Sequence, residues 1–320
     1  IVKSESSWIA DRVRGRIPGK RAVHIWTHPD TGAVLSMTGY RDFGSFIRDL
    51  HTAFMTNSKI GSLLVSGFSF ILLFFLISGL ITYRRFWKGF FRAPPRHLGP
   101  RAWWGGVHRL VALWLLPFLT IVTLTSIFYF GDFSGVLKGN LYPVKPITPR
   151  ETTLPEGFDG ADLDRAIAAA KEVVPDLHPV RVDLPYNNRI GITIFAPSDG
   201  PINLEHGNIM QIDPVTFEIL GNFPREQLPT GNWANQINHN LHTGYWGGFT
   251  SQVLWGGFGL LAAFFSLSGA MVYASRVAGG PEAGDRNAVG RIWQGMSLLR
   301  WGLVLFVLAV VALSILRYAL

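Results

Sequence analysis

The sequence predicts a polytopic α-helical membrane protein that carries two small extracytoplasmic α+β modules and is built as an internal duplication. Three observations lead to this prediction. Hydrophobic residues make up 48% of the chain and charged residues only 16%, with a mean hydropathy of +0.24, which is too apolar for an ordinary soluble domain. Four stretches are long and apolar enough to span a bilayer. Similar short sequence motifs precede the first and third of these stretches and recur at their ends.

The four predicted spans carry no internal charge, as expected of helices that cross the hydrocarbon core. The last span is the shortest, and we expect it to extend at both ends. The spans cover residues 61–83, 110–130, 252–274 and 301–316.

The basic residues are distributed according to the predicted topology. The connection between the first two spans is rich in arginine and holds no acidic residue, and arginines also outnumber acids between the third and fourth spans. The positive-inside rule places both connections in the cytoplasm, so residues 1–60 and the net acidic segment 131–250 lie on the outer side. The net charge of +8 is therefore explained by topology, and no nucleic-acid partner is predicted. The basic residues of the first connection, up to the start of the second span, are Arg84, Arg85, Lys88, Arg92, Arg96, Arg101 and Arg109.

The two outer segments share a strand, turn and strand pattern. In the first, residues 22–26 predict a strand that leads through a turn into a second strand at 33–35. In the second, strands at 209–212 and 218–220 flank a similar turn. The shared pattern supports the duplication.

The second outer segment is the more complete module. Leu163, Ile167 and Ala170 have helical spacing and predict a helix over 161–171. Two further strands are predicted at 179–184 and 189–195, which gives one helix and about four strands in a small α+β module. The predicted domains are 1–50, a partial module; 51–130, a transmembrane helix pair with a basic cytoplasmic loop; 131–240, the second module; and 241–320, a second helix pair.

The sequence has no cysteine, which excludes disulfides, thiolate-ligated iron–sulfur clusters and covalently attached c-type haem. Any redox centre must therefore be held by histidine, methionine or a non-covalently bound cofactor. Neither a dinucleotide-binding glycine fingerprint nor a P-loop is present, so a flavin or nicotinamide would have to be supplied by another protein.

Histidines lie at both ends of the predicted spans. His51 precedes the first span, and His239 and His242 precede the third, in similar phrases on the predicted outer side. His108 lies where the second span begins, on the cytoplasmic side. At 1.5 Å per residue this places His108 about 30 Å from the outer histidines. The first and third spans also end alike, with Ser78-Gly79 and Ser268-Gly269.

These motifs resemble the PepSY-associated transmembrane family. The matching residues are Leu50-His51 and Leu241-His242-Thr243-Gly244 before spans, His108-Arg109-Leu110 opening a span, and the Ser-Gly-x-x-x-Tyr endings. The resemblance extends over nearly the whole chain, and the two outer modules resemble PepSY domains. It implies a protein of the bacterial inner membrane with periplasmic modules. In the siderophore-reductase members of the family, it implies reduction of ferric siderophores with haem b bound in the membrane.

The resemblance also implies which residues hold haem, with two haem b groups expected. His51 and His242 occupy equivalent places in the two repeats and would ligate one iron from opposite sides. His239 would share a helical face with His242, and could be the ligand instead or orient it. His108 would ligate a second haem on the cytoplasmic side. Family members begin with a further helix that opens on His-Arg-Trp, which this sequence lacks, and the second ligand of the His108 haem is expected from that helix.

Two functional hypotheses follow. In the first, a haem b oxidoreductase takes electrons from a quinol or a cytoplasmic reductase and passes them across the lipid membrane to a ferric siderophore, which releases its iron. In the second, the chain is a non-enzymatic membrane regulator whose PepSY-like modules bind a peptide or a protease. The histidines would then be structural residues at helix starts. Arg84, Arg85 and Arg109 lie at the level where they could pair with haem propionates, but we interpret them as topology signals.

Overall fold

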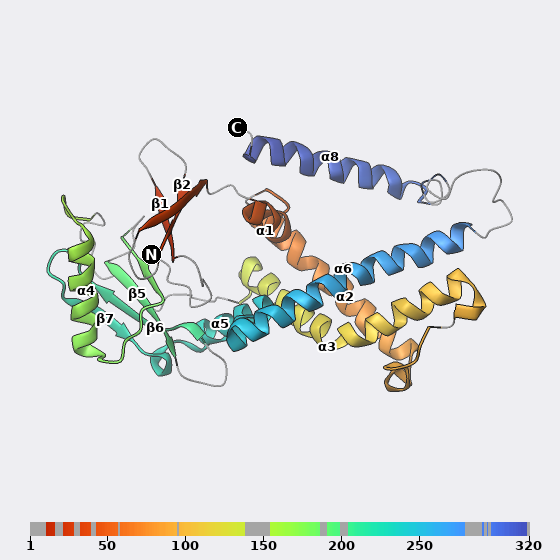
Figure 1. Cartoon of the computed structure of the whole chain (residues 1–320), viewed down its shortest axis with the longest axis horizontal. Coiled ribbons are helices and arrows are strands. Elements are labelled where there is room, and N and C mark those ends of the chain that lie inside the picture. The colour runs from red at the N-terminus through yellow and green to blue at the C-terminus, as the bar shows by residue number, and fades with distance from the viewer. Residues whose placement is uncertain are drawn as a thin grey trace. The chain divides into compact units, whose positions relative to one another are not determined.

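The computed structural model divides the chain into two compact units (Figure 1). The first unit consists of Ile1–Ser45 and Gly135–Gln252, and the second of Phe46–Ser134 and Val253–Leu320. The structure describes residues 11–16, 22–28, 33–39, 43–56, 58–94, 96–137, 154–185, 191–198, 204–278, 290, 293 and 296–318.

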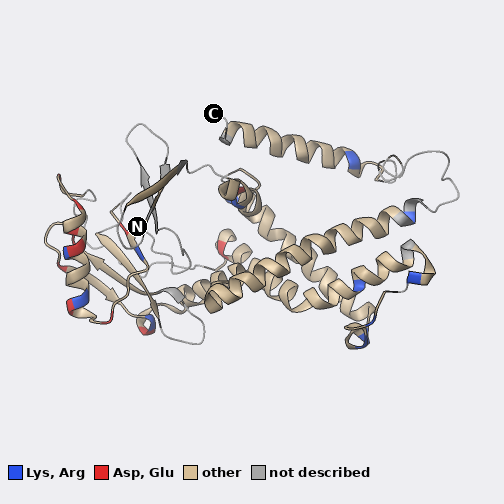
Figure 2. Ribbon diagram, in the orientation of Figure 1, with Lys and Arg blue, Asp and Glu red and all other residues tan. Residues whose placement is uncertain are grey.

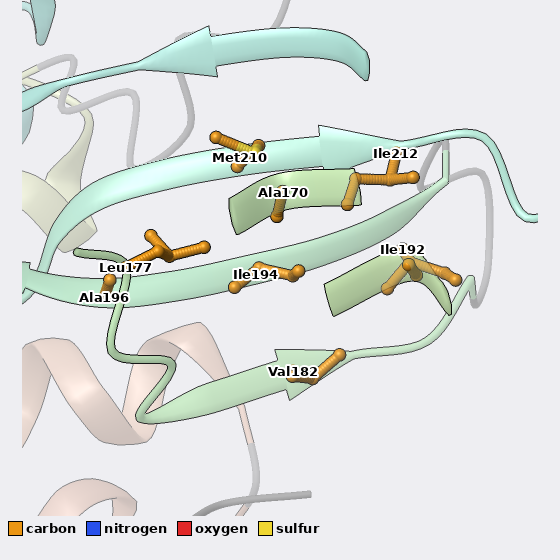
Figure 3. Close-up of a cluster of buried hydrophobic side chains, with 9 residues drawn as sticks. Ala170, Leu177, Val182, Ile192, Ile194, Ala196, Met210 and Ile212 are labelled. Carbon is orange, nitrogen blue, oxygen red and sulfur yellow. The ribbon is translucent and has the colours of Figure 1, made fainter. Parts of the chain in front are cut away.

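The larger sheet of the first unit is antiparallel, with its strands in sequence order. It confirms the predicted module of one helix and four strands. Alternate residues of the two central strands point to one side of the sheet, where the buried face of α4 covers them (Figure 3). Ile194 and Met210 are buried in this core together with Ala166 and Ala170 of α4. The elements are α4 (Gly160–Val173), β4 (Arg181–Asp183), β5 (Ile192–Ser198), β6 (Leu204–Ile212) and β7 (Ile219–Phe223).

Helix α4 begins where its sequence provides a capping box. The Asp159 carboxylate accepts hydrogen bonds from the backbone N–H groups of Ala161 and Asp162, and the Asp162 side chain accepts one from the Asp159 backbone. Pro175 follows the last turn and prevents the helix from continuing. The two ends of the predicted helix were therefore within about two residues of the observed ones.

A second, three-stranded antiparallel sheet is formed by β1 (Asp11–Arg16), β2 (Ala22–Thr27) and β3 (Val34–Gly39), in that order. The two predicted strands are confirmed as β2 and β3. The turn predicted between them lies largely outside the described residues. Strand β1 was not predicted, because four of its six residues are arginine or aspartate and only Val13 is strongly strand-forming.

Four helical segments among the described residues are long and apolar enough to cross a membrane. They confirm the four predicted spans, since each predicted range lies within or overlaps one long helix. The helices are α2 (Lys59–Thr82), α3 (Pro100–Ser134), α6 (Gly248–Ala278) and α8 (Leu299–Tyr318). Two short 3-10 helices, η1 (Phe86–Gly89) and η2 (Arg96–Leu98), lie between α2 and α3.

Helix α3 begins earlier than predicted. Pro100 is the first residue of α3, a position where a missing backbone N–H costs nothing. His108 therefore lies about two turns inside the helix and not at its first residue.

Helices α2 and α3 pack in opposite directions. Phe70 in the first half of α2 meets Phe130 near the end of α3, with ring centroids 5.1 Å apart, and Gly67 faces the same phenylalanine. At the other end, Leu113 of α3 and Tyr83, the residue that follows α2, both lie against Gly89. Hence His108 lies at the end of the pair where α2 finishes, about 33 Å along α3 from Phe130.

Most basic residues of the second unit lie at this same end, although α1 carries Arg48 and α2 begins at Lys59. Figure 2 shows Lys and Arg in the connection from α2 to α3, at the C-terminal end of α6 and at the start of α8. The connection from Thr82 to Pro100 contains no acidic residue. This is the pattern that the positive-inside rule associates with a cytoplasmic end.

Candidate functional site

His239 and His242 lie on a separate short helix, α5 (Thr230–Thr243), and not on the membrane helix that follows. Gly244 ends α5 in the left-handed conformation, with φ of 84°. The turn is closed by the buried hydroxyl of Ser251, which donates to the Gly244 carbonyl at 2.5 Å and accepts from the backbone N–H of Gly247 at 2.9 Å. His242 lies in the last turn of α5, and the Ser251 hydrogen bonds hold the turn that links this helix to α6.

Helix α5 buries an unusual set of carboxamides. Asn238 is one turn before His242 on the same face, is 6% exposed, and its Nδ2 makes no hydrogen bond within the described part of the chain. The Nε2 of Gln236 donates to Oδ1 of Asn232 at 2.6 Å. The buried surface of α5 is therefore made largely of carboxamides, and Asn238 brings one of them to the face that carries His242. The buried carboxamides of α5 are Asn232, Asn235, Gln236, Asn238 and Asn240.

The His239 side chain keeps part of its surface exposed, yet the protein around it still desolvates the ring. This burial lowers the pKa of His239 below the ordinary value of histidine. A lowered pKa favours the neutral imidazole, which is the form that binds a metal.

His51 occupies a comparable place in the second unit. It lies in the last turn of α1 (Phe43–Ala53), and Phe54 and Met55, both with positive φ, separate α1 from α2. Met55 is only 2% exposed and therefore packs in the protein interior. His51 and His242 belong to different units, so their pairing stays a prediction.

His108 is held between two membrane helices. Its ring stacks on Phe265 of α6, with centroids 4.2 Å apart and planes inclined by 10°. Its Nδ1 lies 2.9 Å from Oγ of Ser268, a residue that is fully buried. A methyl group added to Gly269 would lie 3.2 Å from Cε1 of His108, so the glycine gives the ring its close approach to the α6 backbone.

The surroundings of His108 are apolar. Val107, Val111 and Leu115 of α3 are buried against aromatic and aliphatic side chains of α6, including Phe258 and Phe265. Arg109 is exposed and donates from Nε to the Gly105 carbonyl of its own helix at 3.3 Å. The imidazole is therefore the polar group that α3 presents to α6 at this level.

The residues that hold His108 recur on α2. The pattern Phe-Phe-x-x-Ser-Gly-x-x-x-Tyr covers Phe264–Tyr273 on α6 and Phe74–Tyr83 on α2. On α2, however, Phe75 is 61% exposed and nothing lies within 4 Å of a methyl group added to Gly79. Among the described residues, the copy of the motif on α2 thus holds no histidine, so it can serve as a control for the copy on α6.

The sequence identified His108 but not the residues that hold it. In the sequence Ser268-Gly269 is a recurring motif, and the separation of 160 residues between Ser268 and His108 hides their contact. The signal that could have identified it is the recurrence of a serine and a glycine in otherwise apolar spans. Among the described residues, no three histidine, aspartate or glutamate side chains gather into a site for a bare metal ion.

Long apolar helices, a separate α+β module and a histidine enclosed between two spans define a multi-pass membrane protein with an extramembrane domain. The model of the family described as PepSY-associated TM region matches residues 4–276, and the chain therefore belongs to this family. A comparison with curated proteins gives no significant match.

Proposed function

We propose that the protein is a haem b reductase of the bacterial inner membrane, which passes electrons to a ferric siderophore on the periplasmic side. The observation that carries this proposal is the placement of His108, held between α3 and α6 by stacking and a hydrogen bond. Ionisable residues inside membrane helices are costly and generally serve a function. An imidazole with a fixed ring orientation in apolar surroundings is what haem iron requires of an axial ligand.

The histidines of this chain fit that cofactor. His108 would ligate a haem near the basic end of the second unit. His242, with His239 as the competing ligand, would hold the other haem together with His51, as the sequence predicts. Bound haem b supplies a one-electron iron couple of the kind that carries electrons between donor and acceptor.

Transfer of one electron is enough to release iron from the proposed substrate. Siderophores hold Fe(III) through hard oxygen donors, and the softer Fe(II) binds these donors less well. Each ferric chelate takes up one electron, so a quinol donor would reduce two chelates and release two protons. A cytoplasmic reductase is the alternative donor.

The optical spectrum of the purified protein tests this proposal. We expect a Soret band, and an α-band that sharpens when dithionite is added, as for low-spin haem b. His108→Ala should lower the haem content, because the ligand on α3 is lost. His97→Ala is the matched control, since His97 lies on η2 with an exposed side chain and should leave the spectrum unchanged.

A protein without a Soret band would contradict the proposal. That result would favour the non-enzymatic regulator, in which the modules bind a peptide or a protease. Equal haem content in wild type and His108→Ala would instead show that His108 is not a ligand.

A further inference from the structure

We propose that Ser268 is a positioning residue, which holds His108 as the Nδ1–H tautomer and leaves Nε2 as the atom that binds haem iron. This inference rests on the proposed function only for the identity of the metal centre. The tautomer itself follows from contacts between α3 and α6.

The hydroxyl of Ser268 has one hydrogen to donate. Oγ lies 2.7 Å from the carbonyl oxygen of Phe265, one turn earlier on α6. Two oxygen atoms this close repel each other unless a hydrogen lies between them, and a carbonyl has none to give. The hydroxyl of Ser268 therefore donates to Phe265.

The second contact of the hydroxyl is then determined. Nδ1 of His108 lies 2.9 Å from the same Oγ, whose only hydrogen is already used. The hydrogen in this contact must come from the ring, so Nδ1–H donates and Ser268 accepts. In a neutral imidazole the other nitrogen, Nε2, then carries the free lone pair.

The walls of the site hold the ring in this orientation. Phe265 stacks on one face, and the backbone at Gly269 lies close to Cε1. Turning the ring over would move Nδ1 away from its acceptor and leave its N–H without a partner, which is unfavourable. Ser268, Phe265 and Gly269 therefore act together to fix the metal-binding atom.

A hydrogen bond from Nδ1–H also changes the chemistry of the ligand. An acceptor at this position makes the imidazole more basic and a stronger donor to the metal. A stronger donor stabilises Fe(III) relative to Fe(II). Ser268 should therefore lower the reduction potential of a haem bound at His108.

Nitrogen-15 NMR of protein labelled at histidine tests the tautomer, with the haem protein kept in its diamagnetic ferrous low-spin state. His108→Ala identifies the signals of this ring. We expect the proton on Nδ1 in the wild type. Ser268→Ala should displace or broaden these signals, whereas Ser268→Thr, which keeps a hydroxyl, should restore them. Ser78→Ala is the matched control, since it removes the equivalent serine of α2 and should leave the His108 signals unchanged.

A proton on Nε2 in the wild type would overturn the proposal, because Ser268 would then donate to His108. Unchanged His108 signals in Ser268→Ala would overturn it as well. If the purified protein contains no haem, the same spectra can be recorded on the apoprotein. Failure of the proposed function and failure of this inference are therefore distinguishable.

Redox titration gives a second readout in the haem protein. The haem of Ser268→Ala should have a higher midpoint potential than that of the wild type, and Ser78→Ala should match the wild type. Gly269→Ala should disturb the same haem, because the added methyl crowds Cε1, whereas Gly79→Ala places its methyl in open space. An unchanged or lower potential in Ser268→Ala would contradict the positioning role.

Discussion

At the scale of single residues, the chemistry of the protein depends on which histidines are fixed and by what. The sequence alone singled out His51, His108, His239 and His242, because each lies next to an apolar span. It could not supply the partner of His108, because that contact exists only once α3 has packed against α6. A local pattern can identify a ligand type, whereas the orientation of the ring depends on packing between distant segments.

The choice between His242 and His239 can be tested by substitution. His242→Ala should remove the haem bound at the outer site and leave the haem bound at His108. His239→Ala should retain both, because His242, and not His239, occupies the place equivalent to His51 in the two repeats. The measurement is haem content per protein by the pyridine haemochrome method. Loss of haem in His239→Ala but not in His242→Ala would reverse the assignment.

At the scale of helices and strands, the apolar spans could be predicted from composition, whereas the polar helix α5 could not. The spans were predictable because about 20 uncharged apolar residues have few other stable environments. Helix α5 was not predicted as a separate element, since its buried face is made of asparagine and glutamine in place of an apolar stripe. The sequence therefore predicts His242 at the start of the membrane helix, whereas it lies in the last turn of the separate helix α5.

The separation of α5 from α6 depends on Gly244, which ends α5. Its left-handed conformation is costly for any other residue, by roughly 1–2 kcal/mol. Gly244→Ala should therefore lower the thermal unfolding midpoint of the purified protein and reduce the haem held at His242. Gly160→Ala, at the first residue of α4, meets nothing within 4 Å and has no left-handed backbone, so it should leave the midpoint unchanged. Equal midpoints for the two variants would show that the break tolerates a side chain.

At the scale of the whole molecule, charge and family together describe a multi-pass membrane protein of the PepSY-associated family. The distribution of basic residues predicts which end faces the cytoplasm, because the rule depends on composition alone. The pairing of His51 with His242 could not be tested in the same way, since the two residues lie in separate compact units. Sequence periodicity reports local structure, and it carries no information on how such units meet.

The central claim is that electrons cross the membrane through this protein and reduce a ferric chelate outside. The most direct measurement uses sealed vesicles with dithionite inside, and a ferric siderophore with a ferrous-specific chromogenic chelator outside. Vesicles containing the wild-type protein should form the coloured ferrous complex, and vesicles containing His108→Ala should form it more slowly, with His97→Ala as the control that behaves as wild type. A rate no greater than that of protein-free vesicles, or the same rate for His108→Ala as for the wild type, would contradict the account.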